Sequence, residues 1–482
     1  MFGRKSKILP FTLLDIGSYS IRGAFVEIEY KIDKTDYEDF RIVSYGEEIF
    51  RDNKIDIFVM WRENFEKLLE KLKAKNPTIK VEKYLKKIVT VFSPFSFLGF
   101  SPKLIEEDVI YSDHLVYLSS SLLGKMLRLN IEKFSETEKS PNFKLFMPYI
   151  RYFVMGKVEK VDGGEKNGVI LFTPWGYKVS RLKAHINYIT WNKEHAANIE
   201  NMIKSLFPGL DDSLKTHSII ADLWGISPVY KSNLDIANKF WSLIDIGHKF
   251  VNIIFSYNRI EKISKVLDVG EAGEEIIKII EDFYTLFKEK YKDLIFSEFV
   301  SEVFIILEEY LQGGSKNSKS SSSYFNDFCK KYGKEEVELM FKKLSHKFEN
   351  LSKRVADEYA SFLIEFLRNS GEEVKDRMLI IFFTGRLTTL NFFRNFLESL
   401  IRRRLRNLNF RVIFKYIDKG VFQDKFFLSG KNDYVPLTLV GGINLAYYYN
   451  RLGLFGRNEF GGFLDGVFNS LKKIGKFLEK AI

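Results

Sequence analysis

The feature that most constrains the fold of this chain is a hydrophobic unit that occurs twice. Residues 11–16 (FTLLDI) and 241–246 (WSLIDI) are apolar runs that end in Asp-Ile and are followed by glycine. A short turn comes next, and a second apolar run follows at 21–30 and at 250–257. Each unit predicts a strand, a tight turn and a returning strand. Two copies in one chain predict a duplicated α/β core.

Apolar spacing predicts the further elements of the first half. We expect strands over 41–50, 87–92 and 217–222, the last being the apolar run HSIIAD. Helices are expected over 55–75 and 193–206, because apolar residues recur there at helical spacing. Strands that alternate with helices are typical of a sheet covered by helices.

The second half shows the same alternation. An isoleucine-rich helix is expected around 276–280, and a strand over 378–383 followed by a further helix. The glycine pair Gly441-Gly442 is expected to precede a helix that carries Tyr447, Tyr448 and Tyr449.

Two segments stand apart from this pattern. Residues 94–190 are irregular and aromatic, with a Gly163-Gly164 turn and short expected strands, and we interpret them as an inserted subdomain. Residues 313–323 (GGSKNSKSSSS) are of low complexity and predict a surface loop.

Composition excludes several classes of protein. A chain of 482 residues exceeds one ordinary domain, and 45% apolar residues exclude wholesale disorder. The single cysteine, Cys329, excludes a disulfide framework and a Cys-rich zinc site. No run approaches the ~20 apolar residues that span a bilayer, and the basic N-terminus lacks a signal-peptide cleavage site, so we expect a cytoplasmic protein. The net charge of +11 accompanies no nucleic-acid-binding motif, and no Walker A loop is present.

The Asp-Ile-Gly turns have a composition suited to nucleotides. Glycine lets the backbone approach a phosphate closely, and backbone N–H groups and a serine hydroxyl donate to its oxygens. An aspartate can hold Mg²⁺, typically through water. Asp15-Ile16-Gly17-Ser18 fits this description, although one such tetrapeptide is also typical of an ordinary hairpin. Asp245-Ile246-Gly247 and Thr384-Gly385, each at the end of an expected strand, make coincidence less plausible.

In these residues the chain resembles the actin-like ATPase superfamily. Residues 15–22 (DIGSYSIR) resemble its first phosphate loop, 245–253 (DIGHKFVNI) its second, and 383–387 (FTGRL) its adenosine loop. The resemblance covers the whole chain and implies ATP and Mg²⁺ in a cleft between two pseudo-equivalent halves. The ATP-binding residues that it implies are Asp15, Gly17, Ser18, Tyr19, Ser20, Arg22, Asp245, Gly247, His248, Lys249, Thr384, Gly385 and Arg386. It implies Asp15 and Asp245 as the metal-binding residues, and no catalytic residue is assigned.

Within this superfamily the chain is most similar to the FtsA family of bacterial cell-division actin homologues. Residues 183–203 resemble the FtsA segment that leaves the inserted subdomain, and the insertion precedes the second phosphate loop, as in that family. The PilM family is the near alternative, because 15–22 also resemble its first loop. The FtsA resemblance implies the following divisions: subdomain IA at 1–93 and 191–238, an inserted IC-type subdomain at 94–190, IIA at 239–285 and 376–456, IIB at 286–375, a linker at 457–462 and a terminal helix at 463–482.

The chain departs from the superfamily pattern in two loops. After Asp-Ile-Gly the family usually has a small glycine and then threonine, where this chain has His248, Lys249 and Phe250. The adenosine loop usually carries two or three glycines, but Gly385 is followed by Arg386 and Leu387. Bulky side chains would crowd a nucleotide, although Lys249 adds a positive point charge near a phosphate. We therefore expect ATP binding with weak or no ATPase activity.

The C-terminal segment predicts an amphipathic helix. At about 100° per residue its apolar side chains gather on one half of the helix and its lysines on the other. Such a helix lies in a lipid interface, where each lysine near an anionic surface contributes roughly 1 kcal/mol. The predicted membrane-binding residues are Phe463, Leu464, Val467, Phe468, Leu471, Lys472, Lys473, Ile474, Lys476, Phe477, Leu478 and Lys480. The alternative is a helix docked on the protein's own core. The segment also resembles the membrane-targeting helix of FtsA, which PilM generally lacks.

A second basic feature is the run Arg402, Arg403, Arg404 and Arg406, on an expected helix end. Such runs are usually a solvated face. The alternatives are contact with lipid headgroups or with an acidic C-terminal peptide of a partner.

The resemblance implies an FtsA-like function. ATP would favour head-to-tail filaments, and the tail would hold them on the inner face of the cytoplasmic membrane at the division site. The body would recruit FtsZ, through its C-terminal peptide and subdomain IIB, and then other divisome proteins. Three alternatives stay open: a PilM-like pilus scaffold that binds a short peptide of an inner-membrane protein, a sugar or metabolite kinase, and a scaffold that no longer binds nucleotide.

Overall fold

A computed structural model shows how the chain folds. It describes residues 6–17, 19–31, 39–49, 57–75, 77–78, 80–92, 101–119, 122–127, 143–145, 149–155, 159–161, 164–166, 169–171, 177–207, 210, 212–232, 240–257, 260–267, 273–312, 322–370, 378–417, 436–452 and 455. The chain divides into two compact units. The first contains 20–225 with the segments before 17 and from 438 onward, and the second contains 17–19 and 226–437.

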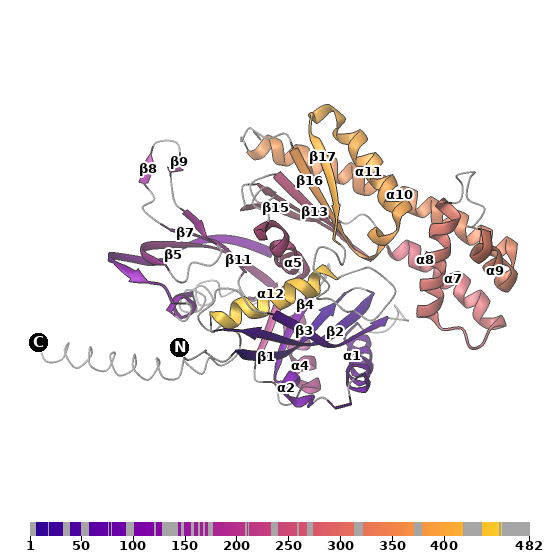
Figure 1. Ribbon diagram of the computed structural model, residues 1–482, viewed down its shortest axis with the longest axis horizontal. Coiled ribbons are helices and arrows are strands. Elements are labelled where there is room, and N and C mark those ends of the chain that lie inside the picture. Colours follow the sequence, from indigo (N-terminus) through magenta and orange to yellow (C-terminus); the bar gives the residue numbers. More distant parts are fainter. Residues whose placement is uncertain are drawn as a thin grey trace, which may run out of the picture. The chain divides into compact units, whose positions relative to one another are not determined.

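The first unit is built on a five-stranded sheet of order β12-β4-β1-β2-β3. Strands β1 to β4 of this sheet are labelled in Figure 1. Three consecutive strands pair antiparallel, and two later strands add in parallel beside β1. The strands are β1 (Lys7–Ile16), β2 (Ser20–Tyr30), β3 (Asp39–Ile49), β4 (Lys87–Phe92) and β12 (Asp212–His217). The central strand β1 is buried almost continuously, as expected for a strand covered on both faces.

The second unit repeats this sheet, with the order β15-β14-β13-β16-β17. Again three antiparallel strands come first, and two strands then add in parallel beside the first of them. The strands are β13 (Phe240–Ile246), β14 (Val251–Tyr257), β15 (Ile260–Leu267), β16 (Met378–Thr384) and β17 (Arg411–Tyr416). The predicted duplicated α/β core is therefore confirmed.

The segment between β4 and β12 forms a separate sheet of order β10-β7-β11-β5, with β6 paired to β11. The strands are β5 (Ser101–Tyr117), β6 (Phe143–Leu145), β7 (Tyr149–Met155), β10 (Val169–Leu171) and β11 (Lys178–Asn192), and β8 (Glu159–Val161) and β9 (Gly164–Lys166) form a small hairpin. The expectation of short strands was wrong for β5 and β11, which have 17 and 15 residues. They pair over most of their length through register shifts, which interrupt the two-residue periodicity of a long strand.

Helices connect the strands in both units. The first unit contains α1 (Ile57–Ala74), α2 (Glu82–Leu85), α4 (Lys193–Leu206) and α12 (Leu437–Arg451). The second contains α7 (Glu274–Lys290), α8 (Phe296–Gln312), α9 (Ser322–Tyr332), α10 (Lys334–Ser370), the 3₁₀ turns η2 (Arg386–Thr389) and η3 (Arg406–Leu408), and α11 (Asn391–Leu405). Helix α5 (Ser218–Ser232) begins in the first unit, and its residues from Ile226 belong to the second.

The prediction of a strand over 217–222 was wrong. Strand β12 ends at His217 and helix α5 begins at Ser218. The His217 ring explains the boundary, because its Nδ1 accepts a hydrogen bond from the backbone N–H of Ile219 (3.1 Å) at the helix start. A short apolar run such as SIIADL does not distinguish a buried strand from a buried helix by periodicity.

Two other boundaries differ from the predictions. Gly441 and Gly442 lie inside α12 rather than before it. Helix α9 begins at Ser322, so the end of the predicted Ser-rich loop is helical, and 313–321 lie outside the described residues.

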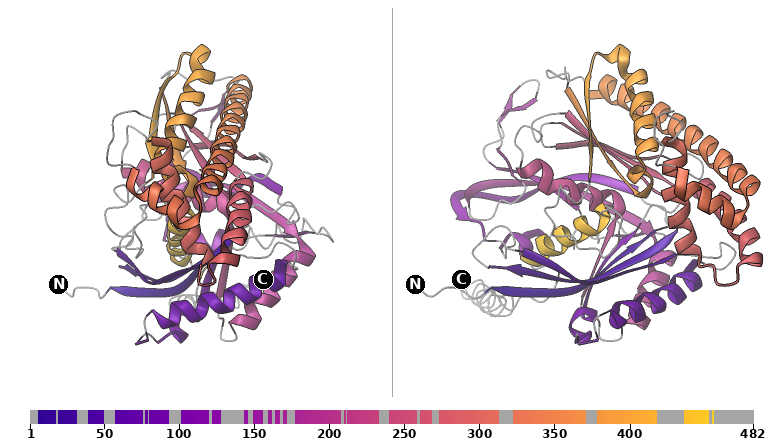
Figure 2. Two further views of the ribbon diagram at one scale, coloured as in Figure 1. Left: turned by 90° about the vertical axis from the view of Figure 1, so that its right-hand side faces the viewer. Right: turned by 45° about the vertical axis from the view of Figure 1, so that its right-hand side comes forward.

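The core of the second unit is aromatic. Helix α10, 37 residues long, runs beside α11 (Figures 1 and 2). Its Tyr359 and Phe366 pack on Phe255 of β14. The Phe255 ring lies 5.5 Å from that of Tyr359 and 5.6 Å from that of Phe366. The buried Tyr359 hydroxyl lies 2.7 Å from the Ser242 hydroxyl, so its polar atom is satisfied. Within the described ranges, no helix is long and apolar enough to cross a membrane.

Candidate functional site

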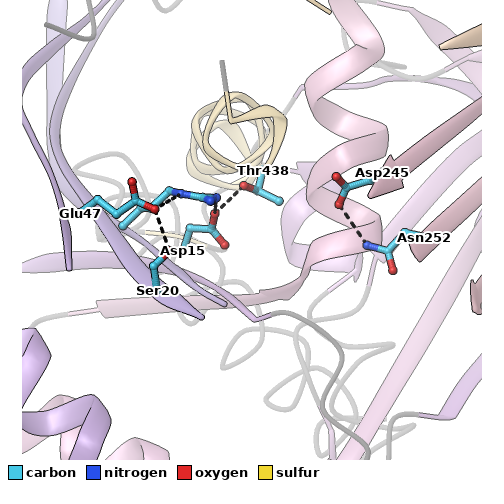
Figure 3. A network of polar contacts seen from close by, with 7 residues as sticks. Asp15, Ser20, Glu47, Asp245, Asn252 and Thr438 are labelled. Atoms are coloured by element: carbon cyan, nitrogen blue, oxygen red, sulfur yellow. Dashed lines mark hydrogen bonds and ion pairs between the residues drawn. The ribbon is translucent and has the colours of Figure 1, made fainter. Parts of the chain in front are cut away.

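Strand register places three charged side chains in a row at one end of the first sheet. Asp15, the penultimate residue of β1, is opposite Arg22 of β2, and Arg22 is opposite Glu47 of β3. Directly opposite residues have their side chains on the same face. Arg22 donates from Nη1 to Asp15 Oδ2 (3.0 Å) and from Nε to Glu47 Oε1 (3.1 Å), as Figure 3 shows. Ser20 Oγ also donates to Glu47 Oε1 (2.8 Å).

Helix α12 completes the environment of Asp15. Thr438, in the first turn of α12, donates from Oγ1 to Asp15 Oδ2 at 2.7 Å (Figure 3). The positive end of the helix dipole also favours a carboxylate there. Asp15 is only 3% exposed, and its charge is compensated by the Arg22 guanidinium. A metal ion at Asp15 would therefore compete with Arg22.

The equivalent position in the second sheet has different chemistry. Asp245 is the penultimate residue of β13 and lies opposite Asn252 of β14. The Asn252 amide donates from Nδ2 to Asp245 Oδ2 at 3.4 Å (Figure 3). On the other side of β13, Thr384 of β16 is in register with Asp245. The partner opposite the aspartate is thus an uncharged amide in this sheet and a guanidinium in the first.

The turn after β13 rests on the N-terminus of α7. Gly247 donates its N–H to the carbonyl of Phe250 (3.0 Å), and Glu274 donates its N–H to the carbonyl of His248 (2.8 Å). Lys249 Nζ lies 3.6 Å from Glu274 Oε2, and its side chain is 42% exposed. The buried Glu274 carboxylate also pairs with Lys278 Nζ (3.3 Å), so the more exposed Lys249 can turn to an anion while Glu274 keeps a cationic partner.

His248 brings no positive charge to this turn. Burial, reinforced by the charges of Lys249 and Lys278, lowers the pKa of His248 to about 3, so the imidazole is neutral at pH 7. Tyr19, which groups with the second unit, stacks its ring on that of His248, with centroids 4.7 Å apart.

Gly385 is required by the backbone. Its φ of 104° lies in the region that favours glycine, and a Cβ there would lie 2.3 Å from the carbonyl oxygen of Ile246. The Gly385 carbonyl accepts from the Thr388 N–H (3.1 Å) and the Thr388 hydroxyl (2.7 Å), which forms the turn η2. The loop after β16 can therefore approach the strand end beside Asp245 only with glycine at this position.

The structure places the predicted residues in two groups. Asp15, Ser20 and Arg22 form the network of the first unit. The group in the second unit is Gly17, Tyr19, Asp245, Gly247, His248, Lys249, Thr384, Gly385 and Arg386, at the ends of β13 and β16 or in the turns described above. Ser18 and the predicted amphipathic segment 463–482 lie outside the described residues. Sequence reasoning missed Glu47, Thr438, Asn252 and Glu274, since strand register and a contact over 423 residues carry no local signal.

A magnesium ion that accompanies a nucleotide needs one or two carboxylates, with phosphates and waters as its other ligands. Asp245, half-buried and opposite an amide, fits that role, whereas Asp15 fits it only after Arg22 moves. Across the described residues, no three Asp, Glu, His or Cys side chains form a cluster that holds a metal by itself.

The sequence matches no family model and no curated protein. Among solved structures it is similar to a chain of a PilM–PilN type IV pilus biogenesis complex, at 9% identity and a TM-score of 0.48, covering 92% of this chain and 98% of that one. It is also similar to the ethanolamine utilization protein EutJ from Carboxydothermus hydrogenoformans (10% identity, 93% and 90% covered, TM-score 0.34). A glucokinase from Balamuthia mandrillaris gives 9% identity, 92% and 94% covered, and a TM-score of 0.33. Such values indicate no ligand, activity or partner for this chain.

The class of the protein is defined by its own topology. Two sheets of identical strand order, each with an aspartate at the end of its first strand, are the duplicated halves that the sequence predicted. The chain is a mixed α/β protein with the actin-like ATPase fold. The closer assignment to the FtsA family stays a prediction.

Proposed function

We propose that this chain is an actin-like ATP-binding protein that forms filaments and tethers FtsZ filaments to the cytoplasmic membrane. The observation that carries the nucleotide part is the repeated strand end, with Asp15 in one half and Asp245 in the other. The loop at Gly385 adds support, because its glycine is needed for close approach to the second of these strand ends.

The charges available suit a triphosphate with its metal. Arg22 and Lys249 each offer a cation whose present partners are carboxylates, and phosphate oxygens can replace a carboxylate as acceptor. Asp245 would hold Mg²⁺ through water, and the ion would neutralise phosphate charge. Backbone N–H groups of the turns after β1 and β13 would donate to the phosphates.

The same residues favour binding over rapid hydrolysis. A general base works best when its pKa is near the ambient pH. The neutral His248, with a pKa of about 3, is too weak a base to take a proton from water efficiently. Asp15 already accepts hydrogen bonds from Arg22 and Thr438. We therefore propose weak or no ATPase activity.

The membrane and FtsZ parts of the proposal are supported by the sequence. The segment 463–482 has the lysines and apolar residues of an interfacial helix, and the FtsA resemblance supplies FtsZ and other divisome proteins as partners. A marginal lipid anchor gains avidity when a filament carries many copies of it.

Nucleotide binding is tested by thermal unfolding with Mg²⁺ and ATP. Unfolding of the full chain should shift to higher temperature with ATP, because a ligand of the native state stabilises it. Asp245→Asn, measured against its own ligand-free baseline, should lose most of the shift, whereas the exposed control Asp293→Asn should keep it. An unaltered melting temperature of the parent chain in saturating ATP contradicts the nucleotide part.

The tethering function is tested by flotation with anionic vesicles and purified FtsZ. FtsZ should float with the vesicles only when the full chain is present. FtsZ that stays in the dense fraction, while the chain itself floats, contradicts the FtsZ part alone.

A further inference from the structure

Strand β17 lies at the edge of the second sheet. Among the described residues β17 pairs only with β16, and it ends the sheet order. Ile417, which follows β17, donates its N–H to the Phe383 carbonyl of β16 at 3.3 Å. Because successive residues of a strand alternate in direction, the even-numbered residues 412–416 point their backbone groups away from β16. An edge of this kind can accept another extended chain.

One face of this edge combines cations with aromatic rings. The Arg402 guanidinium of α11 lies 4.7 Å from the centroid of the Phe414 ring, and its Nη1 donates to the carbonyl of Val412 at 3.0 Å. About two helical turns earlier, the Arg394 guanidinium lies 4.3 Å from the centroid of the Tyr416 ring. Arginine held on an aromatic face keeps its remaining N–H groups available to an anion.

The other face of the same strand is basic as well. Side-chain alternation places Arg411 and Lys415 opposite the face that carries Phe414 and Tyr416. Both cations are exposed, as are Arg403 near the end of α11 and Arg406 at the start of η3. Within the described part of the chain, none of these four cations forms an ion pair, whereas Arg404 pairs with Asp357 of α10.

We propose that this β17 edge surface, formed by Arg402, Arg403, Arg406, Arg411, Phe414, Lys415 and Tyr416, binds an acidic, extended peptide segment of a partner protein. The peptide adds as a strand beside β17. Its acidic side chains face Arg411 and Lys415, and its intervening β-branched or aromatic side chains face Phe414 and Tyr416. The inference is independent of nucleotide binding.

The same cations could serve two simpler roles, and both can be distinguished from peptide binding. Charged residues at a sheet edge prevent pairing with other copies of the same chain. Cations also attract anionic lipid. An acidic strand fits better than lipid, because it pairs with outward backbone groups of β17 and at the same time places carboxylates beside Arg411 and Lys415. If these cations only prevent pairing with other copies of the chain, no peptide should bind.

The test measures fluorescence anisotropy of labelled ten-residue peptides with the full chain. An alternating Glu-Val peptide should bind saturably, whereas a Glu-Pro peptide of equal charge should bind at least tenfold more weakly, since proline removes backbone donors. A Lys-Val peptide should not bind. Equal affinity for the Glu-Val and Glu-Pro peptides overturns strand pairing, and no binding of either overturns the proposal.

Charge-reversed variants locate the binding surface. The double variant Arg411→Glu/Lys415→Glu should weaken Glu-Val binding at least tenfold. The matched control Lys342→Glu/Arg368→Glu, which changes the net charge equally on exposed positions of α10, should weaken it less than twofold. Equal effects of the two variants overturn the location.

Vesicle co-sedimentation separates lipid from peptide. The edge variant should pellet with phosphatidylglycerol-containing vesicles as well as the parent chain. Loss of pelleting in the edge variant but not in the α10 control assigns the surface to lipid and overturns the peptide proposal.

Discussion

Glu27 shows how a single buried charge is stabilised in this protein. Its carboxylate accepts hydrogen bonds from Arg41 (2.6 Å), Lys83 (2.7 Å) and the Tyr84 hydroxyl (2.7 Å). Burial opposes ionisation, but these donors outweigh it and lower the pKa of Glu27 to about 2, from an ordinary 4.5. Arg41 belongs to β3, and Lys83 and Tyr84 belong to α2, so the charge on β2 connects three neighbouring elements of the first unit.

The first prediction concerns the pH dependence of stability. Because the folded pKa lies below the unfolded one, the stabilisation is complete well above pH 4.5 and is lost as pH falls towards 2. Glu27→Gln should lower the free energy of unfolding at pH 7 by up to about 3 kcal/mol. The difference from the parent should shrink by about 1 kcal/mol at pH 3.5, as measured by urea unfolding.

The control for this prediction is Glu29→Gln, an exposed position on the same strand. It should change stability little at either pH. A Glu27→Gln deficit of the same size at pH 7 and pH 3.5 would show that the lost interaction does not depend on ionisation.

At the scale of elements, the glycine pair in α12 has a packing role. A Cβ at Gly441 would lie 1.6 Å from the carbonyl oxygen of Ala221 in α5, which is backbone. A Cβ at Gly442 would meet only the end of the Leu13 side chain, at 2.5 Å. Glycine at 441 thus lets two buried helices of the first unit approach closely, and the same helix delivers Thr438 to Asp15.

The second prediction compares Gly441→Ala with Gly442→Ala. Both changes favour the helix intrinsically by about 1 kcal/mol. Gly441→Ala must move a helix backbone and should destabilise by on the order of 3 kcal/mol, whereas Gly442→Ala requires only a Leu13 rotamer change and should cost less. Thermal unfolding, with soluble yield as a second measure, checks the order. Equal or reversed losses contradict close packing at Gly441.

The elements also show what the sequence determines locally. The helix at 193–206 and the strand at 87–92 were predicted with their boundaries, because each has a clear period and a definite break at its ends. The failures lie where buried helix and buried strand look alike, as in 217–222, and where a glycine pair serves packing rather than a turn, as in α12. The partners of Asp15 were not predicted, for a different reason. Glu47 depends on the register of three strands, and Thr438 on a contact between distant parts of the chain.

At the scale of the whole molecule, the proposed tether depends on many weak anchors. If the segment 463–482 forms the predicted helix, its four lysines at roughly 1 kcal/mol each and its apolar face would give a reversible attachment for a single chain. Attachment should become strong only when filaments present several tails to one surface. Vesicle binding should therefore rise more steeply with protein concentration than a one-site isotherm.

The third prediction concerns the C-terminal segment as the membrane anchor. Deletion of 463–482 should abolish co-sedimentation with anionic vesicles, because the predicted interfacial residues are then absent. Lys472→Glu/Lys476→Glu, which keeps the length and the apolar face, should weaken binding strongly on anionic vesicles and little on neutral ones. A truncated chain that pellets as well as the full chain contradicts the anchor, while a full chain that binds with a simple one-site isotherm contradicts its dependence on filaments.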